Sequence, residues 1–522
     1  MAWLSGWDKR IKLTTDQTKI DTADLQWFPV TVFLSPTHGD CVFDELTSDA
    51  NRFKIAFTKA DGETQLYGEI EKWDDANESA IIHVSRDGWV ISNTENTDFY
   101  MYYDIDHADN TDYISGSGIA DIGSACTDRV GQNQGTNTFI DLANPANLTG
   151  KITNVAIYAA VSMASAKVAT FYRPDPINFP NNFTARSVSG DLGTVAAGGV
   201  RNFEVNLDAV KGDFIGIYFT DEYDFIETSA TGGSGVVYKS GDQTACVDAT
   251  FTLLAGQANS LYGTGTTGVG CNVWDGYFKL VSHQADATTS TVEDSTSNNN
   301  NGTKTSANNP TQVAGKVGFA QSFDAAEEAI TLGLFNVASV LTVEAIIKPD
   351  AGCIARDYPT IIEERVGSDD WWFLLSAGKL AATLWQSNAV AKQTNFSAES
   401  ALTAGVDYYV VQLADGSNLH AYVNATEYGV AVAYNGTIKN SATASYIGKD
   451  TTAGRYWSGL IDEVRISSTN RSTAWIKATY NSLWDTLLTY GSEETEGWPH
   501  KWNGVTIGKL NGAVITKWNG VA

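Results

Sequence analysis

The sequence has no long apolar run, and its start, Met-Ala-Trp-Leu-Ser-Gly-Trp, lacks the basic segment that opens a signal peptide. A membrane-spanning helix needs about 18 or more consecutive apolar residues. We therefore expect neither a signal peptide nor insertion into a membrane. The chain is expected to be made in a cytoplasm and to reach the outside by another route, such as release of virus particles by lysis.

Cysteine and histidine are scarce. The five cysteines are scattered and lack Cys-x-x-Cys spacing, which argues against a zinc site and against a disulfide framework. A single bridge, such as Cys246 to Cys271, remains open. None of the six histidines stands beside a nucleophile elbow, and no phosphate-binding glycine loop lies between a strand and a helix.

Basic residues are also few. Lys and Arg total 34 against 61 Asp and Glu, a formal net charge of −27. An acidic surface repels phosphates and anionic lipids, so we expect no nucleic-acid partner and no binding to anionic membranes. The same acidity is compatible with calcium sites.

The residues that are abundant indicate folded β-structure. Hydrophobic residues make up 43% and charged residues 18%, as in globular proteins, and 47 glycines suit many turns. At 522 residues the chain exceeds one ordinary core, so several domains are expected. We predict an all-β protein of tandem β-sandwiches, divided at 1–115, 116–284, 285–486 and 487–522.

The sequence pattern of residues 1–115 predicts a first β-sandwich. Strand-like segments Arg52–Phe57 and Gln65–Trp73 flank an Asp61-Gly62 turn, the signature of a hairpin. The order of these motifs resembles an uncharacterised β-sandwich family of large surface proteins, although the Tyr-Tyr-Gly-Asn ending of that family is replaced by Tyr102-Tyr-Asp. The resemblance implies no activity.

Residues 116–284 predict a second β domain with the character of a jelly roll. Alternating segments such as 152–158, 167–172 and 213–219 are separated by glycine-rich turns, as at 232–235.

Four motifs follow in order within 285–486. They are an Asn-rich opening at 293–302, the segment 315–324, the strand 341–348, and a closing Leu-Ile-Asp-Glu-Val-Arg-Ile at 460–466. Together they resemble the laminin-G/concanavalin-A-like family over about 287–486. The resemblance implies a sandwich that binds glycans or proteins, with a minority of glycosidases in the wider superfamily. It also implies a Ca²⁺ ion at the rim, with Asp324 and Asp462 as candidate ligands.

A glycosidase of this fold needs two carboxylates on one strand face, and no Glu-x-Asp-x-Glu pattern occurs. Asp462 and Glu463 are adjacent, as are Glu363 and Glu364, so regular strand geometry sends the members of each pair to opposite faces. We predict Asp462 on one face with Leu460, Val464 and Ile466. If no cation binds Asp462, it is expected to accept backbone N–H bonds or to pair with Arg. No catalytic residue is predicted.

Three tryptophans are candidates for stacking on a sugar: Trp371, Trp372 and Trp385. Because Trp371 and Trp372 are adjacent in a strand, one should lie in the core and the other should be exposed.

A helix is predicted over 473–480, capped by Ser472. In the tail at 487–522, a Lys-x-Asn-Gly motif recurs every eight residues, and Asn-Gly favours two-residue hairpin turns. A short β-meander of this size cannot stand alone, so it is expected to dock on its own protein, on copies of itself or on a partner, with Trp502 and Trp518 supplying the contact. The alternative is a flexible tail. The tail resembles the ends of phage structural proteins.

These features favour a non-enzymatic structural or adhesion protein on a virion surface, such as a phage fibre, spike or head-surface appendage. Its expected partners are other virion proteins, through the tail, and a glycan or host receptor; a homo-oligomer, with a trimer favoured, is expected. The alternatives are an extracellular adhesin of a bacterium or archaeon and a glycan-degrading enzyme.

Overall fold

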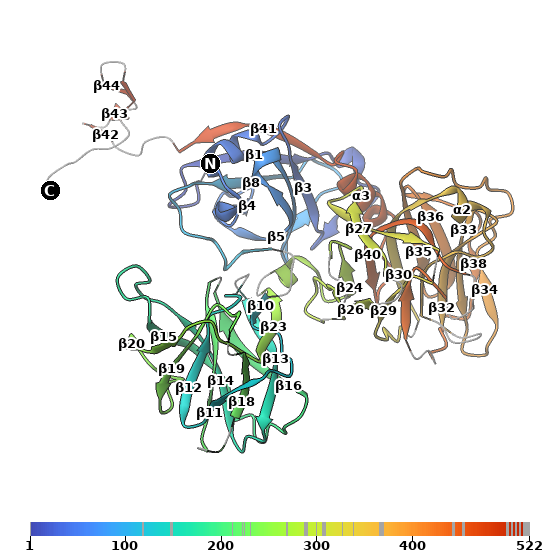
Figure 1. Cartoon of the computed structure of the whole chain (residues 1–522). Coiled ribbons are helices and arrows are strands. Elements are labelled where there is room, and N and C mark those ends of the chain that lie inside the picture. The colour runs from blue at the N-terminus through green and yellow to red at the C-terminus, as the bar shows by residue number, and fades with distance from the viewer. Residues whose placement is uncertain are drawn as a thin grey trace.

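The fold is described from a computed structural model (Figure 1). The structure describes residues 2–116, 120–146, 150–210, 212–221, 223, 225–229, 231–267, 270–286, 291–298, 300–304, 309–325, 327–337, 339–364, 370–440, 444–450, 455–496, 501–502, 505–506, 509–510 and 513–514. Strands dominate these residues, which confirms the predicted all-β class. None of the described helices is long and apolar enough to cross a membrane.

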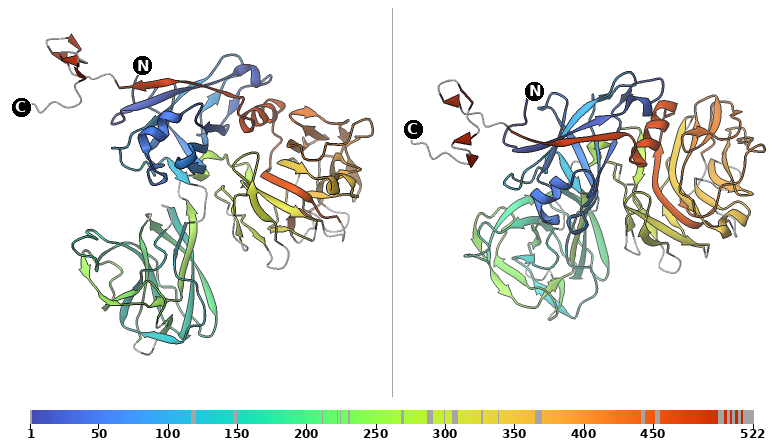
Figure 2. Two further views of the ribbon diagram at one scale, coloured as in Figure 1. Left: turned by 45° about the horizontal axis from the view of Figure 1, so that its top comes forward. Right: turned by 90° about the horizontal axis from the view of Figure 1, so that it is seen from above.

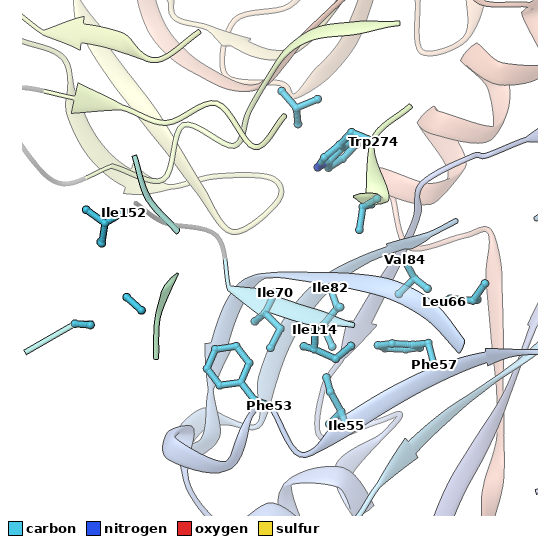
Figure 3. Close-up of a cluster of buried hydrophobic side chains, with 14 of the residues drawn as sticks. Phe53, Ile55, Phe57, Leu66, Ile70, Ile82, Val84, Ile114, Ile152 and Trp274 are labelled. Carbon is cyan, nitrogen blue, oxygen red and sulfur yellow. The ribbon is translucent and has the colours of Figure 1, made fainter. Parts of the chain in front are cut away.

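The first domain is built on an eight-stranded sheet in the order β3-β6-β5-β4-β8-β1-β41, with β9 paired to β5. These strands are β1 (Lys9–Thr15), β3 (Val30–Leu34), β4 (Ile55–Lys59), β5 (Gln65–Asp74), β6 (Ser79–Ser85), β8 (Asp98–Tyr103), β9 (Ile114–Gly116) and β41 (Leu488–Thr495). The short helix α1 (Asp40–Leu46) adds Val42, Phe43 and Leu46 to the core. Figure 3 shows apolar side chains of β4, β5, β6 and β9 gathered in this core.

One edge of this sheet comes from the far end of the sequence. Strand β41 pairs antiparallel with β1, with Lys9 opposite Thr495 and Thr15 opposite Leu488. Figure 1 shows β41 running beside β1. The predicted tail of 487–522 is therefore not one unit, because its first strand completes the first domain.

The second domain consists of two seven-stranded sheets, ordered β10-β23-β13-β18-β11 with β16 and β22 attached, and β20-β15-β14-β17-β12-β19-β21. The first holds β10 (Ala120–Gly123), β11 (Gly131–Gln134), β13 (Gly150–Val161), β16 (Val200–Ala209), β18 (Phe225–Ser229), β22 (Ala258–Asn259) and β23 (Leu261–Thr267). The second holds β12 (Asn137–Asp141), β14 (Ala166–Tyr172), β15 (Asn182–Val188), β17 (Phe214–Phe219), β19 (Val236–Ser240), β20 (Ala249–Thr250) and β21 (Thr252–Leu254).

The third domain is a sandwich whose nine-stranded front sheet runs β27-β28-β40-β30-β35-β36-β37, with β24 on β40 and β38 on β36. Its strands are β24 (Phe278–Ser282), β27 (Thr311–Ala314), β28 (Phe319–Asp324), β30 (Leu341–Pro349), β35 (Tyr408–Ala414), β36 (Asn418–Val423), β37 (Thr426–Glu427), β38 (Val432–Ala433) and β40 (Ser458–Ser467). The predicted start at 285 is too late, because β24 already belongs to this sheet.

The eight-stranded back sheet runs β25-β26-β29-β39-β31-β32-β33-β34. Its strands are β25 (Thr291–Val292), β26 (Gly302–Lys304), β29 (Ile330–Leu332), β31 (Thr360–Glu364), β32 (Trp371–Ser376), β33 (Lys379–Trp385), β34 (Ala391–Gln393) and β39 (Ser445–Ile447), and the short helix α2 (Ala351–Ala355) precedes β31. A core that includes Val343, Ile347, Phe373 and Val410 lies between the two sheets.

The helix α3 (Thr473–Leu483) joins the first and third domains and confirms the predicted helix and its cap. Ser472 Oγ accepts a hydrogen bond from Trp475 N at 3.1 Å. Trp475 packs edge-on against Phe28 of the first domain, while Ile476 packs on the outer face of the front sheet. Figures 1 and 2 show α3 wedged between the two domains.

A buried carboxylate–histidine cluster between the first and third domains

The first domain contributes three ionisable side chains from β5 and β6. Glu69 lies opposite His83 in the β5–β6 ladder, and the register shifts between Ile70 and Lys72. The shift leaves Glu71 as the extra residue of a β-bulge, a device that re-aims a side chain. Glu69, Glu71 and His83 are all buried.

The third domain supplies a second bulge, in β40. Glu463 has φ +48°, which is rare for a residue with a side chain, and the β30–β40 register shifts around it. Ile461, Val464 and Ile466 face the sandwich core. Ile461 and Val464 are an odd number of positions apart, so the alternation of inward and outward side chains shifts by one residue between them. The prediction that Asp462 shares a face with Val464 and Ile466 is therefore wrong. Asp462, Glu463 and Arg465 all face away from that core, because the bulge inserts one residue.

His283, which directly follows β24, completes the site. Its Nδ1 lies 2.5 Å from Glu463 Oε1 and 3.5 Å from Glu71 Oε2. His83 Nε2 lies 2.9 Å from the same oxygen of Glu71, and the two imidazole rings stack with centroids 4.7 Å apart. We call Glu69, Glu71, His83, His283, Asp462, Glu463 and Arg465 the interdomain cluster.

Each of three inner side chains is held from outside by a further group. Thr31 Oγ1 lies 3.2 Å from His83 Nδ1. The Arg465 guanidinium donates to Glu463 Oε2. Glu69 Oε1 lies 3.7 Å from His283 Nε2, and Glu69 Oε2 accepts a 2.5 Å hydrogen bond from Trp274 Nε1. These contacts fix the directions of the His83, Glu463 and His283 side chains. One further nitrogen or oxygen atom of each points toward the centre of the cluster.

Burial and mutual charge shift the pKa values of the cluster. Burial, reinforced by Glu463, raises the pKa of Glu71 to about 8. Burial and the same neighbour raise the pKa of Asp462 well above its ordinary value. Burial disfavours a charged His283, but the carboxylates of Glu463 and Glu71 outweigh it and raise its pKa well above 6.5. Burial lowers the pKa of His83.

A cavity of about 240 Å³ adjoins the cluster, and Glu71 and His283 form part of its wall. Asp286, Glu293 and Phe319 also line it. The cavity therefore reaches the cluster at Glu71 and His283.

The predicted sugar-binding tryptophans lie in the third domain, but two of them are covered. Trp371 is fully buried in the sandwich core. Trp372 points to the opposite face, as strand geometry requires, yet only 7% of it is exposed. The prediction that one of this pair is exposed is wrong, because Tyr358 and Arg455 pack against Trp372. Trp385 is partly buried and packs against a small cluster of Trp372, Leu374 and Ala381.

The two predicted calcium ligands do not come together. Asp324 is exposed at the end of β28, opposite Ser458, whereas Asp462 lies four residues further along β40, about 13 Å away at the usual rise of a strand. Asp462 Oδ2 accepts hydrogen bonds from the backbone N–H groups of Lys316 and Val317, both at 3.0 Å. Asp462 therefore has the backbone partners expected in the absence of an ion.

The tail is described only in part. Strands β42 (Lys501–Trp502) and β43 (Val505–Thr506) pair across one Asn-Gly, and β44 (Lys509–Leu510) and β45 (Ala513–Val514) pair across the next. The side chain of Trp502 and the whole of Trp518 lie outside the described residues. Cys246 is a free thiol, so the bridge to Cys271 that was left open does not form.

Sequence reasoning missed the interdomain cluster, although two signals were present. Glu69 and Glu71 stand two apart in a strand, and His83 interrupts the apolar run Ala80–Val84. Ionisable residues in buried strand segments indicate a paired or ligand-binding group. Their meeting with His283 and Glu463 depends on the docking of two domains.

One family model matches part of the third domain. Residues 324–477 match the family model of the concanavalin A-like lectin/glucanases superfamily, laminin-G type. The match confirms, for this part of the chain, the resemblance predicted from the sequence. The comparison with curated proteins gives no match.

Three solved structures are among those that match part of the chain. They are the binding domain of Paraclostridial Mosquitocidal Protein 1 (13% identity, TM-score 0.34), the receptor-binding domain of botulinum neurotoxin D (15%, 0.32), and domain 4 of an extracellular arabinanase from Geobacillus stearothermophilus in complex with arabinotriose (19%, 0.32). The alignments cover 40%, 39% and 38% of this chain, and 52%, 52% and 98% of those structures. The chain thus spans about half the length of the two toxin structures.

Proposed function

We propose that the protein is a non-enzymatic binding protein of a virion surface, a phage fibre, spike or head-surface appendage, whose third domain contacts a glycan or a host receptor. The proposal rests chiefly on how the front sheet is covered. Glu344, Asp462 and Glu463 project from its outer face, and all three are buried against α3 or the first domain. Retaining or inverting hydrolysis needs two carboxylates beside a sugar, and these carboxylates have no open face to a polysaccharide.

The proposed glycan contact is the exposed ring of Tyr358. Tyr358 is 40% exposed, and the Arg455 guanidinium lies 5.1 Å from its ring centroid and 4.8 Å from that of Trp372. An aromatic ring that packs against a neighbouring cation on one face offers its other, apolar face to a sugar, with hydrogen-bond donors beside it. Trp372 supports this platform from below.

A glycan array probed with the full chain tests the binding proposal. We expect retention of at least one glycan, and Tyr358→Ala should weaken it about tenfold, as loss of one stacked ring predicts. Tyr223→Ala is the matched control, because Tyr223 is 68% exposed but lies in the second domain. A reducing-sugar assay on the retained glycan should show no turnover. Turnover abolished by one Asp or Glu substitution would overturn the non-enzymatic assignment.

The proposed place on a particle is supported by the tail. Paired strands of two residues each bury too little surface to stand alone, which favours docking on other copies or on virion proteins. Electron microscopy of the purified chain should show three-fold particles joined at their carboxyl ends. Monodisperse monomers would overturn the assembly part of the proposal.

A further inference from the structure

We propose that Glu71, His83, His283 and Glu463 bind one divalent transition-metal ion, with Zn²⁺ as the expected ion, and that this ion fastens the first domain to the third. Two ligands come from each domain. The inference is independent of glycan binding, because it concerns a buried interdomain site.

The donor atoms are already close to the required geometry. One ligand atom from each of the four residues lies within 4.8 Å of all the others. In a tetrahedral site with bonds of about 2.0–2.2 Å, neighbouring donor atoms stand roughly 3.4 Å apart. His83 Nε2 and His283 Nδ1 lie 2.9 and 3.5 Å from Glu71 Oε2. Side-chain shifts of about an ångström or less would therefore centre an ion among them.

The groups around the four ligands match the outer shell of a metal site. A ligating histidine usually hydrogen-bonds through its other ring nitrogen, which fixes its tautomer and orientation. Thr31 Oγ1 lies 3.2 Å from that nitrogen of His83, and the Glu69 carboxylate lies near that nitrogen of His283 at 3.7 Å, just beyond hydrogen-bond distance. Arg465 holds one oxygen of Glu463 and leaves Oε1 directed inward.

An orphaned atom supports the same arrangement. His283 Nε2 is buried and makes no hydrogen bond, although Glu69 Oε1 stands 3.7 Å away. If Nδ1 binds an ion, Nε2 must carry the proton, and a modest shift would let it donate to Glu69. The metal-bound state is thus compatible with a hydrogen-bond partner for this buried atom.

The carboxyl groups of the cluster can also balance the charge of a bound cation. Four carboxyl side chains, those of Glu69, Glu71, Asp462 and Glu463, are buried here, and the Arg465 guanidinium donates to one of them, Glu463. Arg465 also interacts electrostatically with the Glu344 carboxylate. Buried carboxylates without compensating charge are costly. A dication supplies that charge without a change in the fold.

The donor set favours zinc over calcium. Imidazole nitrogens suit zinc and other transition metals, whereas calcium prefers six to eight oxygens. Four protein ligands make a closed site of the structural kind. The cavity lined by Glu71 and His283 provides an entry path for the ion.

Metal content and Co²⁺ spectroscopy of the full chain provide the first test. Protein purified without chelator should contain about one Zn²⁺ per chain, and removal of the metal should lower the melting temperature. Co²⁺ added to the stripped protein should give the intense visible bands of a tetrahedral site. A stripped chain that binds neither ion, or that melts at the same temperature with and without zinc, would overturn the proposal.

Variants locate the site. We expect Glu71→Gln to abolish stoichiometric zinc binding, and Thr31→Val to weaken it about 10- to 100-fold through loss of the outer partner of His83. His420→Ala is the matched control, because His420 lies on β36, away from the cluster, and pairs with Asp415 and Glu427. This variant should bind zinc as the parent does. Because Glu71→Gln can impair folding, circular dichroism should accompany each titration. The Co²⁺ spectrum of the parent chain tests for a tetrahedral metal site without the use of any variant. Unchanged binding in folded Glu71→Gln, or loss in His420→Ala, would refute the assignment to these residues.

Discussion

Removing the chain from residue 488 onward should destabilise the first domain, although that domain begins some 480 residues earlier in the sequence. Truncation after 487 deletes β41 and exposes the edge of β1. Truncation after 496 removes only the Asn-Gly repeats and keeps the β1–β41 ladder. The two truncations form a matched pair, because both lack the terminal repeats.

The magnitude follows from the contacts of β41. Six residue pairs are in register with β1. Glu494 binds the largely buried Arg10 at 2.7 Å, and Tyr490 Oη accepts a hydrogen bond from Phe33 N at 3.0 Å. Each hydrogen bond contributes about 0.5–1 kcal/mol net, a reduced value because the edge of β1 would regain water. The loss of β41 should therefore lower the free energy of unfolding by about 3–6 kcal/mol. This is a large fraction of the roughly 5–15 kcal/mol that stabilises an ordinary domain.

Hydrogen exchange and urea unfolding measure the effect. In the shorter chain, the amides of β1 and β8 should exchange faster by about two to four orders of magnitude, in line with that loss of stability. The chain that ends at 496 should match the full protein in both measurements. Equal protection of β1 in the two truncations would refute the pairing of β41 with the first domain.

Three further outcomes are expected. Gly448→Ala should lower the free energy of unfolding, measured in urea, by about 2–3 kcal/mol, because Gly448 has φ +87° and a Cβ there would lie 2.2 Å from a ring carbon of Phe323. Gly405→Ala is the control: Gly405 has φ +75° and open space around it, so the loss should be only about 1 kcal/mol. Burial raises the pKa of Asp141 from 3.8 to about 6, so the folded chain holds a proton that the unfolded chain releases. The stability of the second domain should therefore fall by up to about 3 kcal/mol as pH rises from 4 to 6, and Asp141→Asn should flatten this slope; a parent slope equal to that of the variant would contradict it. Burial raises the pKa of the Cys353 thiol to about 12, so this thiol should resist a disulfide reagent at pH 8 until urea unfolds the chain, and prompt labelling of folded protein would contradict its burial.

Local patterns predicted much of the fold. Alternating strands, glycine-rich turns and an Asn-Gly repeat indicated an all-β chain, and Ser472 before an apolar helical segment predicted α3 with its cap. These features depend on neighbours within a few residues, which the sequence displays directly. The order of motifs between Glu293 and Ile466 likewise sufficed to indicate the concanavalin-A-like sandwich.

The candidate site could not be predicted in this way. Strict alternation placed Asp462 and Glu463 on opposite faces, and a bulge at Glu463 reversed that result. A bulge is decided by pairing with a neighbouring strand, so the strand's own sequence does not reveal it. The covering of Trp372 by Arg455 and Tyr358 is another long-range outcome.

The amino-acid sequence by itself therefore determined the strands, the capped helix and the family of the third domain, because each depends on local periodicity. The tertiary structure alone decided that β41 completes the first domain and that Glu71 and His83 meet His283 and Glu463. These contacts join residues far apart in the chain, and they form only because burial of the apolar faces around α3 brings two domains together.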